Sequence, residues 1–270
     1  MEPVKTIIIT GGGGYLGRSV ARWWAKPGTN IVIVDRDAEK LEKCRADLTV
    51  SGANLTVMAT DLTVPDHLRS AVASLPDSLW SSPPSLVLAH GVAGKSARSH
   101  LPRLDNLDHD HWQEILDANL TSIVFTIQGF LPFMKRAGGG RIVLVSSAAG
   151  LSASPTAALC YSVAKAAVAA LPRLLAPELA AWQVLINAVA AGKFVNPDWP
   201  DEPAQVKRYE TSVPLGRLAS ADEVAALIGF LSSDANTYLT GQTILQDGGR
   251  LSGTSPVAGG ECTDPQITPV

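Results

Sequence analysis

The chain alternates short runs of apolar, mostly β-branched residues with longer segments of helical pattern. The first run is TIIIT at 6–10, and others are NIVIVD at 30–35, SLVLAHG at 85–91 and GRIVLVSS at 140–147. These runs are apolar along most of their length, whereas a strand with one exposed face alternates apolar and polar residues. Strands that are buried on both faces and separated by helices are typical of a parallel sheet with helical crossovers. We therefore predict an α/β fold.

Three further runs bring the number of expected strands to seven: NLTVMATD at 54–61, VLINAVA at 184–190 and QTILQDGG at 242–249. Long helices are expected at about 108–136 and 156–181. This succession predicts a doubly wound, Rossmann-type three-layer sandwich around a seven-stranded parallel sheet. We expect residues 1–250 to form one domain and residues 251–270, which lack periodicity, to form a C-terminal tail.

Charge and cysteine content argue against several classes of function. The formal net charge is −3, with Lys and Arg scattered along the chain, which disfavours binding to nucleic acid or to an anionic membrane. Cys44, Cys160 and Cys262 form no CxxC pair, so neither a disulfide framework nor a zinc site is indicated. No apolar run reaches the roughly 18 residues of a membrane span, and no signal peptide precedes the first strand. We expect a soluble, cytoplasmic protein.

The glycine run that follows the first strand predicts a phosphate-binding turn. In a strand–helix unit, the amides at the start of the helix carry a partial positive charge at the end of the sheet. Gly11 can supply the sharp turn, Gly13 or Gly14 a bare backbone that a pyrophosphate can approach, and Gly17 a close contact between helix and sheet. A plain flexible turn is the alternative, but the position of the run between a strand and a helix disfavours it.

A carboxylate at the end of the second expected strand strengthens this interpretation. Asp35 lies close to the ~20-residue offset of a dinucleotide-binding fingerprint. Its oxygens would accept hydrogen bonds from the hydroxyls of the adenosine ribose, and its charge would repel a 2′-phosphate. Arg36 complicates the choice, because a guanidinium can bind that phosphate. We predict NAD as the cofactor, with NADP as the less favoured alternative.

The chain resembles the short-chain dehydrogenase/reductase family from its first strand to DGG at 247–249. TGGGGYLG at 10–17 differs from the family's TGxxxGxG pattern and fits the TGxxGxxG spacing of the extended branch, whose additional C-terminal domain this chain is too short to contain. The remainder is similar to the single-domain branch, through ATDLT at 59–63, ANLTS at 118–122, IVLVSS at 142–147 and YSVAK at 161–165. The long stretch 214–249 is also similar almost throughout.

The resemblance implies a catalytic tetrad of Asn119, Ser147, Tyr161 and Lys165 within a dinucleotide-binding and catalytic domain. It further implies that the two long helices pair between subunits in a homodimer or homotetramer. The positions expected to bind the nicotinamide cofactor, from the resemblance and from the glycine turn with its carboxylate, are Gly11, Gly14, Tyr15, Leu16, Gly17, Asp35, Arg36, Asp61, Leu62, Ala89, His90, Gly91, Tyr161, Lys165, Phe194 and Asn196.

Three positions depart from the family pattern. LAHG at 88–91 replaces NNAG, so His90 stands where a small residue usually lies near the nicotinamide ribose. Ala191 and Gly192 replace a proline–glycine pair. Asn196 stands where a threonine usually holds the carboxamide. A histidine at a strand end is about as often a packing residue with satisfied hydrogen bonds as a ligand-binding one.

The four-residue spacing of Tyr161 and Lys165 suits acid–base chemistry. On a helix the two side chains share a face, so the ammonium can lie close to the phenol and lower its pKa towards neutrality. Ser147 would donate a hydrogen bond to the substrate oxygen as charge develops there. Asn119 would complete a proton relay to solvent through water. The predicted reaction interconverts a secondary alcohol and a ketone by hydride transfer.

Other interpretations of the sequence stay open. One is a nucleotide-binding sensor or scaffold without turnover, favoured by the departures at LAHG and Ala191–Gly192. Another is epimerase or dehydratase chemistry, favoured by the TGxxGxxG spacing. DHDHW at 108–112 is expected to cap a helix rather than to bind a metal. Cations in the loop 92–105 (Lys95, Arg98, His100) and in the segment 194–213 indicate either an anionic substrate or a solvated rim.

Overall fold

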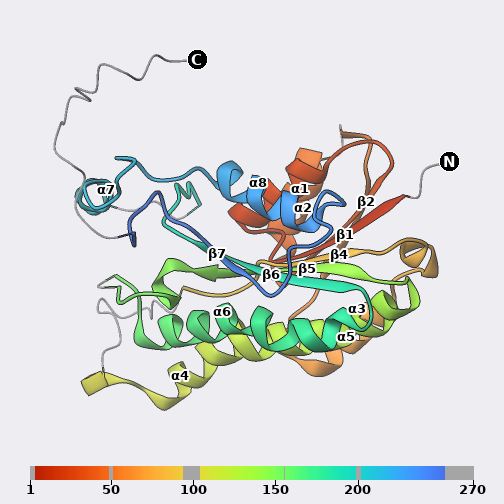
Figure 1. Cartoon of the computed structure of the whole chain (residues 1–270), viewed down its shortest axis with the longest axis horizontal. Helices are drawn as coiled ribbons and strands as arrows, with labels where there is room; N and C mark the ends of the chain where they lie inside the picture. Colours follow the sequence, from red (N-terminus) through yellow and green to blue (C-terminus); the bar gives the residue numbers. More distant parts are fainter. Residues whose placement is uncertain (1–3, 49–50, 94–103, 155, 199–201, 253–270) are drawn as a thin grey trace.

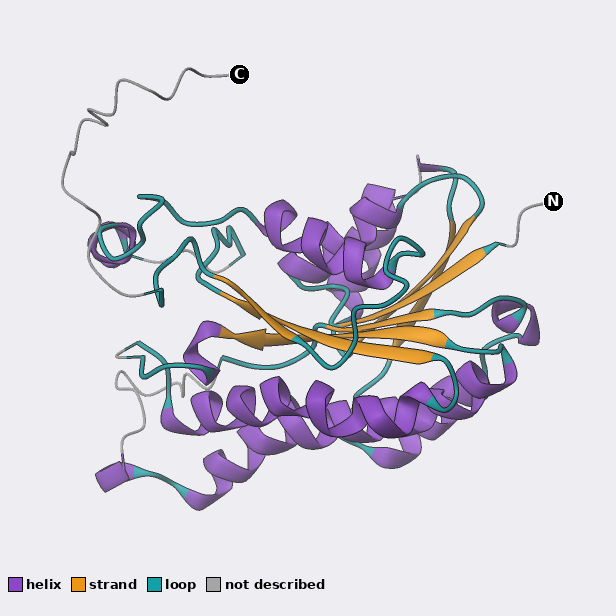
Figure 2. Cartoon of the chain, viewed as in Figure 1, coloured by secondary structure: helices purple, strands orange, loops and turns teal. Residues whose placement is uncertain are grey.

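The structure, a computed structural model, describes residues 4–48, 51–93, 104–154, 156–198 and 202–252. Its strands form one parallel sheet in the order β3-β2-β1-β4-β5-β6-β7 (Figures 1 and 2). The strands are β1 (Lys5–Thr10), β2 (Thr29–Asp35), β3 (Asn54–Ala59), β4 (Ser85–Leu88), β5 (Gly140–Ser147), β6 (Val184–Ala191) and β7 (Thr243–Gln246). The prediction of a doubly wound, seven-stranded parallel sheet is confirmed.

Helices cover both faces of the sheet. In Figure 1, α1, α2 and α8 lie on one face, α3, α4, α5 and α6 lie on the other, and α7 stands apart at one end. The α-helices are α1 (Tyr15–Trp24), α2 (Ala38–Leu48), α3 (Pro65–Ala73), α4 (His109–Leu116), α5 (Ser122–Arg136), α6 (Leu159–Ala180), α7 (Pro203–Glu210) and α8 (Ala221–Ser232). Two separate apolar clusters fill the two interfaces between the sheet and these layers.

Burial along the strands follows their place in the sheet. Ile7, Ile8 and Ile9 of β1 are fully buried because helices cover both faces of this central strand. The expectation of two-sided burial is wrong for β3, whose residues are exposed or partly exposed, because β3 is an edge strand and pairs on one side only. The polar residues Asn54 and Thr56, at alternate positions of β3, are consistent with an edge strand.

Local sequence signals set where several helices begin. Asp108 caps α4 by accepting a hydrogen bond from the backbone N–H of Asp110 (3.3 Å), which confirms the capping role expected for DHDHW. Ser220 and Glu223 form a reciprocal capping box at the start of α8. Of the two adjacent tryptophans in α1, Trp24 is buried whereas Trp23 is exposed, as their different helix faces require.

The two long helices were predicted close to their observed bounds. The segment 108–136 contains α4, a π-helical turn at Asp117–Thr121 and α5, and the segment 156–181 contains α6. By length and composition His109–Arg136 and Leu159–Ala180 could cross a membrane, but both pack beneath the sheet as core helices do (Figure 1). Exposed apolar side chains such as Phe125 and Val163 lie on these helices. Their pairing between subunits stays a prediction.

The order of the strands reverses between β1 and β4. Chain connections run outward from this point in both directions, so the loops that follow β1 and β4 leave a crevice between them at the carboxyl edge. The glycine run follows β1 and LAHG follows β4. The fold therefore brings these two motifs to one place.

Two glycines inside helices predict opposite effects of substitution by alanine. A Cβ on Gly129 of α5 would meet Leu68 at ordinary contact distances of 3.7–3.9 Å, so Gly129→Ala should gain the helix propensity of alanine, about 1 kcal/mol. A Cβ on Gly229 of α8 would lie 2.4 Å from the Trp23 indole, so Gly229→Ala should lose about 1–2 kcal/mol. Chemical denaturation of both variants checks the sign, and a stabilised Gly229→Ala would contradict this packing of α8 on Trp23.

Candidate active site

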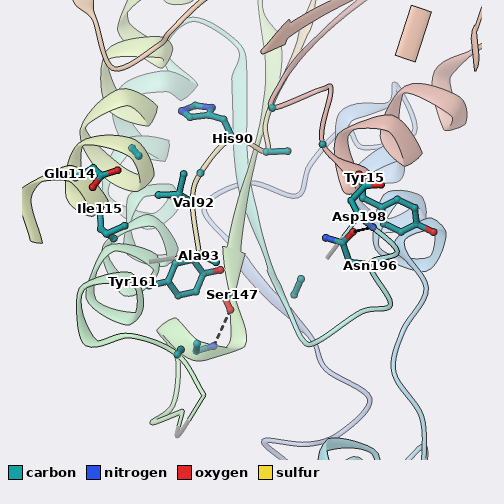
Figure 3. A pocket seen from close by; sticks show the side chains of 18 of the residues that line it. Tyr15, His90, Val92, Ala93, Glu114, Ile115, Ser147, Tyr161, Asn196 and Asp198 are labelled. Atoms are coloured by element: carbon teal, nitrogen blue, oxygen red, sulfur yellow. Dashed lines mark hydrogen bonds between the residues drawn. The ribbon is translucent and has the colours of Figure 1, made fainter. Parts of the chain in front are cut away.

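A cavity of about 1290 Å³ opens at the carboxyl edge of the sheet. It extends from Asp35 at the end of β2 to Arg250 beyond β7, and it brings together most of the residues predicted for the cofactor and for catalysis (Figure 3). The predicted residues that line it are Gly11, Gly14, Tyr15, Asp35, Arg36, Asp61, Leu62, Ala89, His90, Gly91, Ser147, Tyr161, Phe194 and Asn196. Leu16, Gly17, Asn119 and Lys165 lie behind this lining.

Glycine is required at different positions of the first turn for different structural reasons. Gly11 adopts φ +65°, and a Cβ there would lie 2.6 Å from the Cα of His90, so this position needs glycine for both conformation and space. A Cβ on Gly17 would lie 2.3 Å from the carbonyl oxygen of Gly11, which is the close contact predicted for it. Gly14 lines the cavity, and a Cβ there would meet only that same carbonyl, at 3.2 Å. Its missing side chain leaves the approach to the helix open.

The start of α1 suits an anionic group. Gly14 is the N-cap, no side chain caps the helix, and the first turn contains no acidic residue. The backbone N–H groups of this turn therefore remain as donors at the positive end of the helix dipole. A bare glycine turn, uncapped amides and a carboxylate at the end of β2 together fit the pyrophosphate and ribose of a dinucleotide.

Asp35 is held in place by backbone amides. Its Oδ2 accepts from the N–H of Gly13 (3.1 Å) and its Oδ1 from the N–H of Asp37 (3.1 Å). The carboxylate is thereby tied to the glycine turn, and both Asp35 and Arg36 line the cavity. Asp61 accepts from the backbone and hydroxyl of Thr63 (2.9 and 2.7 Å), and the Thr63 hydroxyl is the largest cause of a lowered pKa for the Asp61 carboxyl.

Tyr161 and Ser147 both line the cavity, near the carboxyl end of β5. Figure 3 shows the two side chains on one side of the cavity, with the Ser147 oxygen turned toward a backbone nitrogen, and Tyr15, Asn196 and Asp198 on the far side. Burial raises the pKa of Tyr161 above its ordinary value, and the hydrogen bond with Ser147 offsets part of that rise. The Ser147 oxygen also accepts from the backbone N–H of Ala149 (3.2 Å). The phenol is therefore protonated at neutral pH.

Lys165 is buried behind Tyr161. Its Nζ donates to the carbonyl of Val145 (3.0 Å) and lies 5.7 Å from the centre of the Tyr161 ring. Burial lowers the pKa of Lys165 to about 8. The expectation that this ammonium lowers the pKa of Tyr161 below its ordinary value is wrong for this arrangement, because the ammonium is turned to a backbone carbonyl while burial acts on the phenol directly.

Asn119 lies in the π-helical turn and is fully buried. Its Nδ2 donates to the carbonyls of Val92 and Ile115 (3.0 Å each), and its Oδ1 accepts from the N–H of Val92 (3.3 Å). A Cβ on Gly91 would lie 2.4 Å from this Oδ1 and 3.4 Å from Nζ of Lys165. Asn119 therefore anchors the loop after β4, and its part in a proton relay stays a prediction.

His90 uses both ring nitrogens inside the protein. Nδ1 lies 2.6 Å from the Thr10 hydroxyl and Nε2 lies 2.9 Å from the Ser122 hydroxyl, so the ring joins the end of β1 to the start of α5. Burial, with a smaller contribution from the charge of Lys165, lowers the pKa of His90 to about 3. The ring is thus a neutral packing group, although His90 is among the residues that line the cavity.

The wall opposite α4 closes on α1 through an ion pair. The Arg18 guanidinium binds both oxygens of Asp198 (3.0 and 2.8 Å) and also donates to the carbonyl of Gly13 (3.0 Å). Asn196 accepts from the N–H of Asp198 (3.1 Å). These contacts hold the segment after β6 beside the glycine turn.

Cys160, predicted to be a packing residue, is buried against Ile115.

Several residues named from the sequence lie outside the described residues. They are Lys95, Arg98, His100, Cys262 and the tail from 253 onward. Two other cavity residues, Lys193 and Arg250, were missed by sequence reasoning. They come from two segments with no recognisable spacing, and the only signal was the position of Lys193 just after a strand end. Tyr209, which also lines the cavity, lies in the segment 194–213 that the sequence analysis related to the substrate.

The chain is similar to known proteins along most of its length. The family model described as enoyl-(acyl carrier protein) reductase matches residues 15–250. The chain is 32% identical over 249 residues to a 7alpha-hydroxysteroid dehydrogenase of Bacteroides fragilis, covering 91% of this chain and 93% of that protein. It is 34% identical over 249 residues to a cis-4-hydroxycyclohexanecarboxylate dehydrogenase of Sinomonas cyclohexanicum, covering 91% and 96%.

Solved structures resemble the whole fold. A 3-oxoacyl-[acyl-carrier protein] reductase with bound NAD from Brucella melitensis superposes with a TM-score of 0.82 at 26% identity, covering 92% of this chain and 91% of that one. An L-sorbose reductase from Gluconobacter frateurii, complexed with NADPH and L-sorbose, gives a TM-score of 0.79 at 25% identity, covering 93% and 97%.

The buried, neutral His90 predicts an acid-sensitive fold. Its pKa is about 3 in the folded state and near 6.5 when unfolded, so the unfolded chain binds the extra proton as the pH falls below 6.5. Between pH 6.5 and 4 this linkage should lower the free energy of unfolding of the wild type by about 3 kcal/mol. His90→Gln should not show this decrease. Urea unfolding of both proteins across this range measures the difference. Parallel pH profiles would contradict the buried neutral ring.

Proposed function

The chain belongs to the short-chain dehydrogenase/reductase family, and on that premise we propose that it interconverts a secondary alcohol and a ketone with NAD(H). The observation that carries this proposal is that the protonated phenol of Tyr161 and the hydroxyl of Ser147 line the same cavity as the glycine turn. An acid and a hydrogen-bond donor thus converge on a space next to a dinucleotide site.

Each side chain has a separate task in the proposed reduction. Ser147 orients the ketone oxygen and stabilises the negative charge that develops on it. Tyr161 donates its proton to that oxygen, and in the reverse direction takes it back. The nicotinamide cofactor, when bound, supplies or accepts the hydride. Lys165 provides a positive charge behind the phenol, and Asn119 fixes the loop at Gly91 against which the reacting groups lie.

The relatives support the reaction class. Two of them are named as dehydrogenases of ring alcohols: one of a hydroxysteroid and the other of a hydroxycyclohexanecarboxylate. A sensor or scaffold without turnover has no use for a phenol held beside a hydroxyl donor in a cavity. Epimerase or dehydratase chemistry is favoured only by the TGxxGxxG spacing, whereas the chain is similar to relatives named as dehydrogenases over nearly their full length.

Tyr161→Phe should remove the proton donor while leaving the fold and the dinucleotide site intact. We expect kcat/KM to fall by about 10²- to 10⁴-fold with a panel of alcohols and ketones, followed by absorbance of the reduced cofactor. Alcohol oxidation by the wild type should accelerate as pH rises, because the phenol must first lose its proton.

The matched control is Tyr238→Phe, since Tyr238 is almost fully exposed and does not line the cavity. This variant should keep wild-type rates, and both variants should keep the wild-type Kd for cofactor. Unchanged turnover in Tyr161→Phe would eliminate the mechanism, and binding of cofactor without turnover of any alcohol by the wild type would favour a sensor.

Asp35 should set the preference for NAD. Its carboxylate faces the cavity and would repel a 2′-phosphate, while the guanidinium of the adjacent Arg36 compensates that repulsion in part. Asp35→Asn keeps an acceptor oxygen for Gly13 but removes the charge. The ratio of the Kd values for NADP and NAD should fall at least tenfold, as measured by fluorescence titration. Asp47→Asn, on the exposed face of α2, should not change the ratio, and an unchanged ratio in Asp35→Asn would refute the assignment.

A further inference from the structure

Three partly buried side chains from separate segments meet at the end of the cavity beyond β6. Lys193 follows β6, Tyr209 lies in α7 and Arg250 follows β7, and all three line the same cavity as Tyr161. The Arg250 guanidinium carbon lies 4.8 Å from the centre of the Tyr209 ring, and Nζ of Lys193 lies 5.8 Å from it. The Tyr209 hydroxyl accepts from the backbone N–H of Lys193 (2.9 Å). Two cations therefore share one aromatic ring.

The position of Arg250 is set before any ligand arrives. Asp247 accepts from the backbone N–H groups of Gly249 (2.9 Å) and Leu251 (2.7 Å), which shapes the turn that carries Arg250. Nε of Arg250 donates to the Ser212 hydroxyl (3.1 Å). Because the guanidinium is held by the ring and the hydroxyl, little side-chain entropy remains to be lost on binding.

The order of strands places this pair on the substrate side of the cavity. Ser147 of β5 is the register partner of Ala191 of β6, which is the partner of Gln246 of β7. Neighbouring strands lie about 4.8 Å apart, so Lys193 and Arg250 follow the next two strands beyond Ser147. The glycine turn and Asp35 follow β1 and β2, on the other side of β4. A dinucleotide that spans β2 to β5 leaves the cations to a second ligand.

Charge on the facing wall is of opposite sign. Asp108, Asp110 and Glu114, at and within α4, line the cavity across from the cations, and the side chains of Asp110 and Glu114 are largely exposed. An elongated substrate that carries a negative charge would therefore be drawn to the β6–β7 end and away from α4.

We propose that the substrate carries an anionic group, a carboxylate or a phosphate monoester, which Lys193 and Arg250 bind; this inference rests on the proposed alcohol–ketone function. A guanidinium presents paired donors that match both anions, and an ammonium adds a point charge. Both cations lie within 5.8 Å of the centre of the Tyr209 ring, so one anionic group can reach both. The anion orients the substrate so that its carbinol or carbonyl carbon lies toward Ser147 and Tyr161.

Binding of unreactive anions tests this without requiring turnover. Cyclohexanecarboxylate, cyclohexyl phosphate and the neutral cyclohexanecarboxamide are titrated by calorimetry into enzyme saturated with reduced cofactor. At least one anion should bind ten or more times more tightly than the amide, and the better of the two identifies the anionic class. Arg250→Gln and Lys193→Gln should each remove most of that preference.

The control variant is Arg208→Gln, an exposed cation of α7 that does not line the cavity, and it should keep the preference. Equal affinity for the anions and the amide in the wild type would overturn the proposal. A loss of cofactor affinity in Arg250→Gln and Lys193→Gln, with the preference for anions unchanged, would also overturn it, since the cations would then bind the dinucleotide. If anions bind as expected but no hydroxy acid or hydroxyalkyl phosphate is oxidised, the proposed reaction fails while this binding site stands.

Discussion

All strands of the sheet run parallel, and this shared direction is the constraint on which the site depends. Each strand delivers the residues that follow it to the same edge, so Asp35, Gly14, Gly91, Ser147 and Lys193 gather although they are scattered along the chain. Parallel strands must be covered on both faces, which buries the central strands and leaves the carboxyl edge as the place where polar groups can meet ligands.

Burial behind that edge decides the electrostatic state of the reacting groups. The same desolvation lowers the pKa of Lys165 to about 8 and that of His90 to about 3, and it raises the pKa of Tyr161. In each case the neutral form is favoured over the charged one. The site therefore presents a protonated phenol and a neutral imidazole, with one ammonium held at a backbone carbonyl.

Charged side chains are distributed unevenly along the cavity. In the function proposed above, ribose recognition belongs to the β2 side, phosphate recognition to the glycine turn, proton transfer to β5 and anion recognition to the β6–β7 end. Acidic side chains on α4 face the last of these. Such a gradient can orient two ligands at once, because each end of the cavity favours a different charge. In this proposal, specificity for the substrate comes from the segments that follow β6 and β7, which carry Lys193, Tyr209 and Arg250.

The sequence by itself determined the number and direction of the strands and placed the glycine turn after the first of them, because these follow from local periodicity and spacing. From spacing and family motifs it also predicted roles for Asp35 and the tetrad residues. It could not determine that β3 is an edge strand, that Asn119 sits in a π-helical turn or that His90 bonds to Thr10 and Ser122. Nor could it pair Lys193 with Arg250. Contacts between distant segments and the pKa values of buried groups depend on which atoms surround them, and only the tertiary structure decides those surroundings.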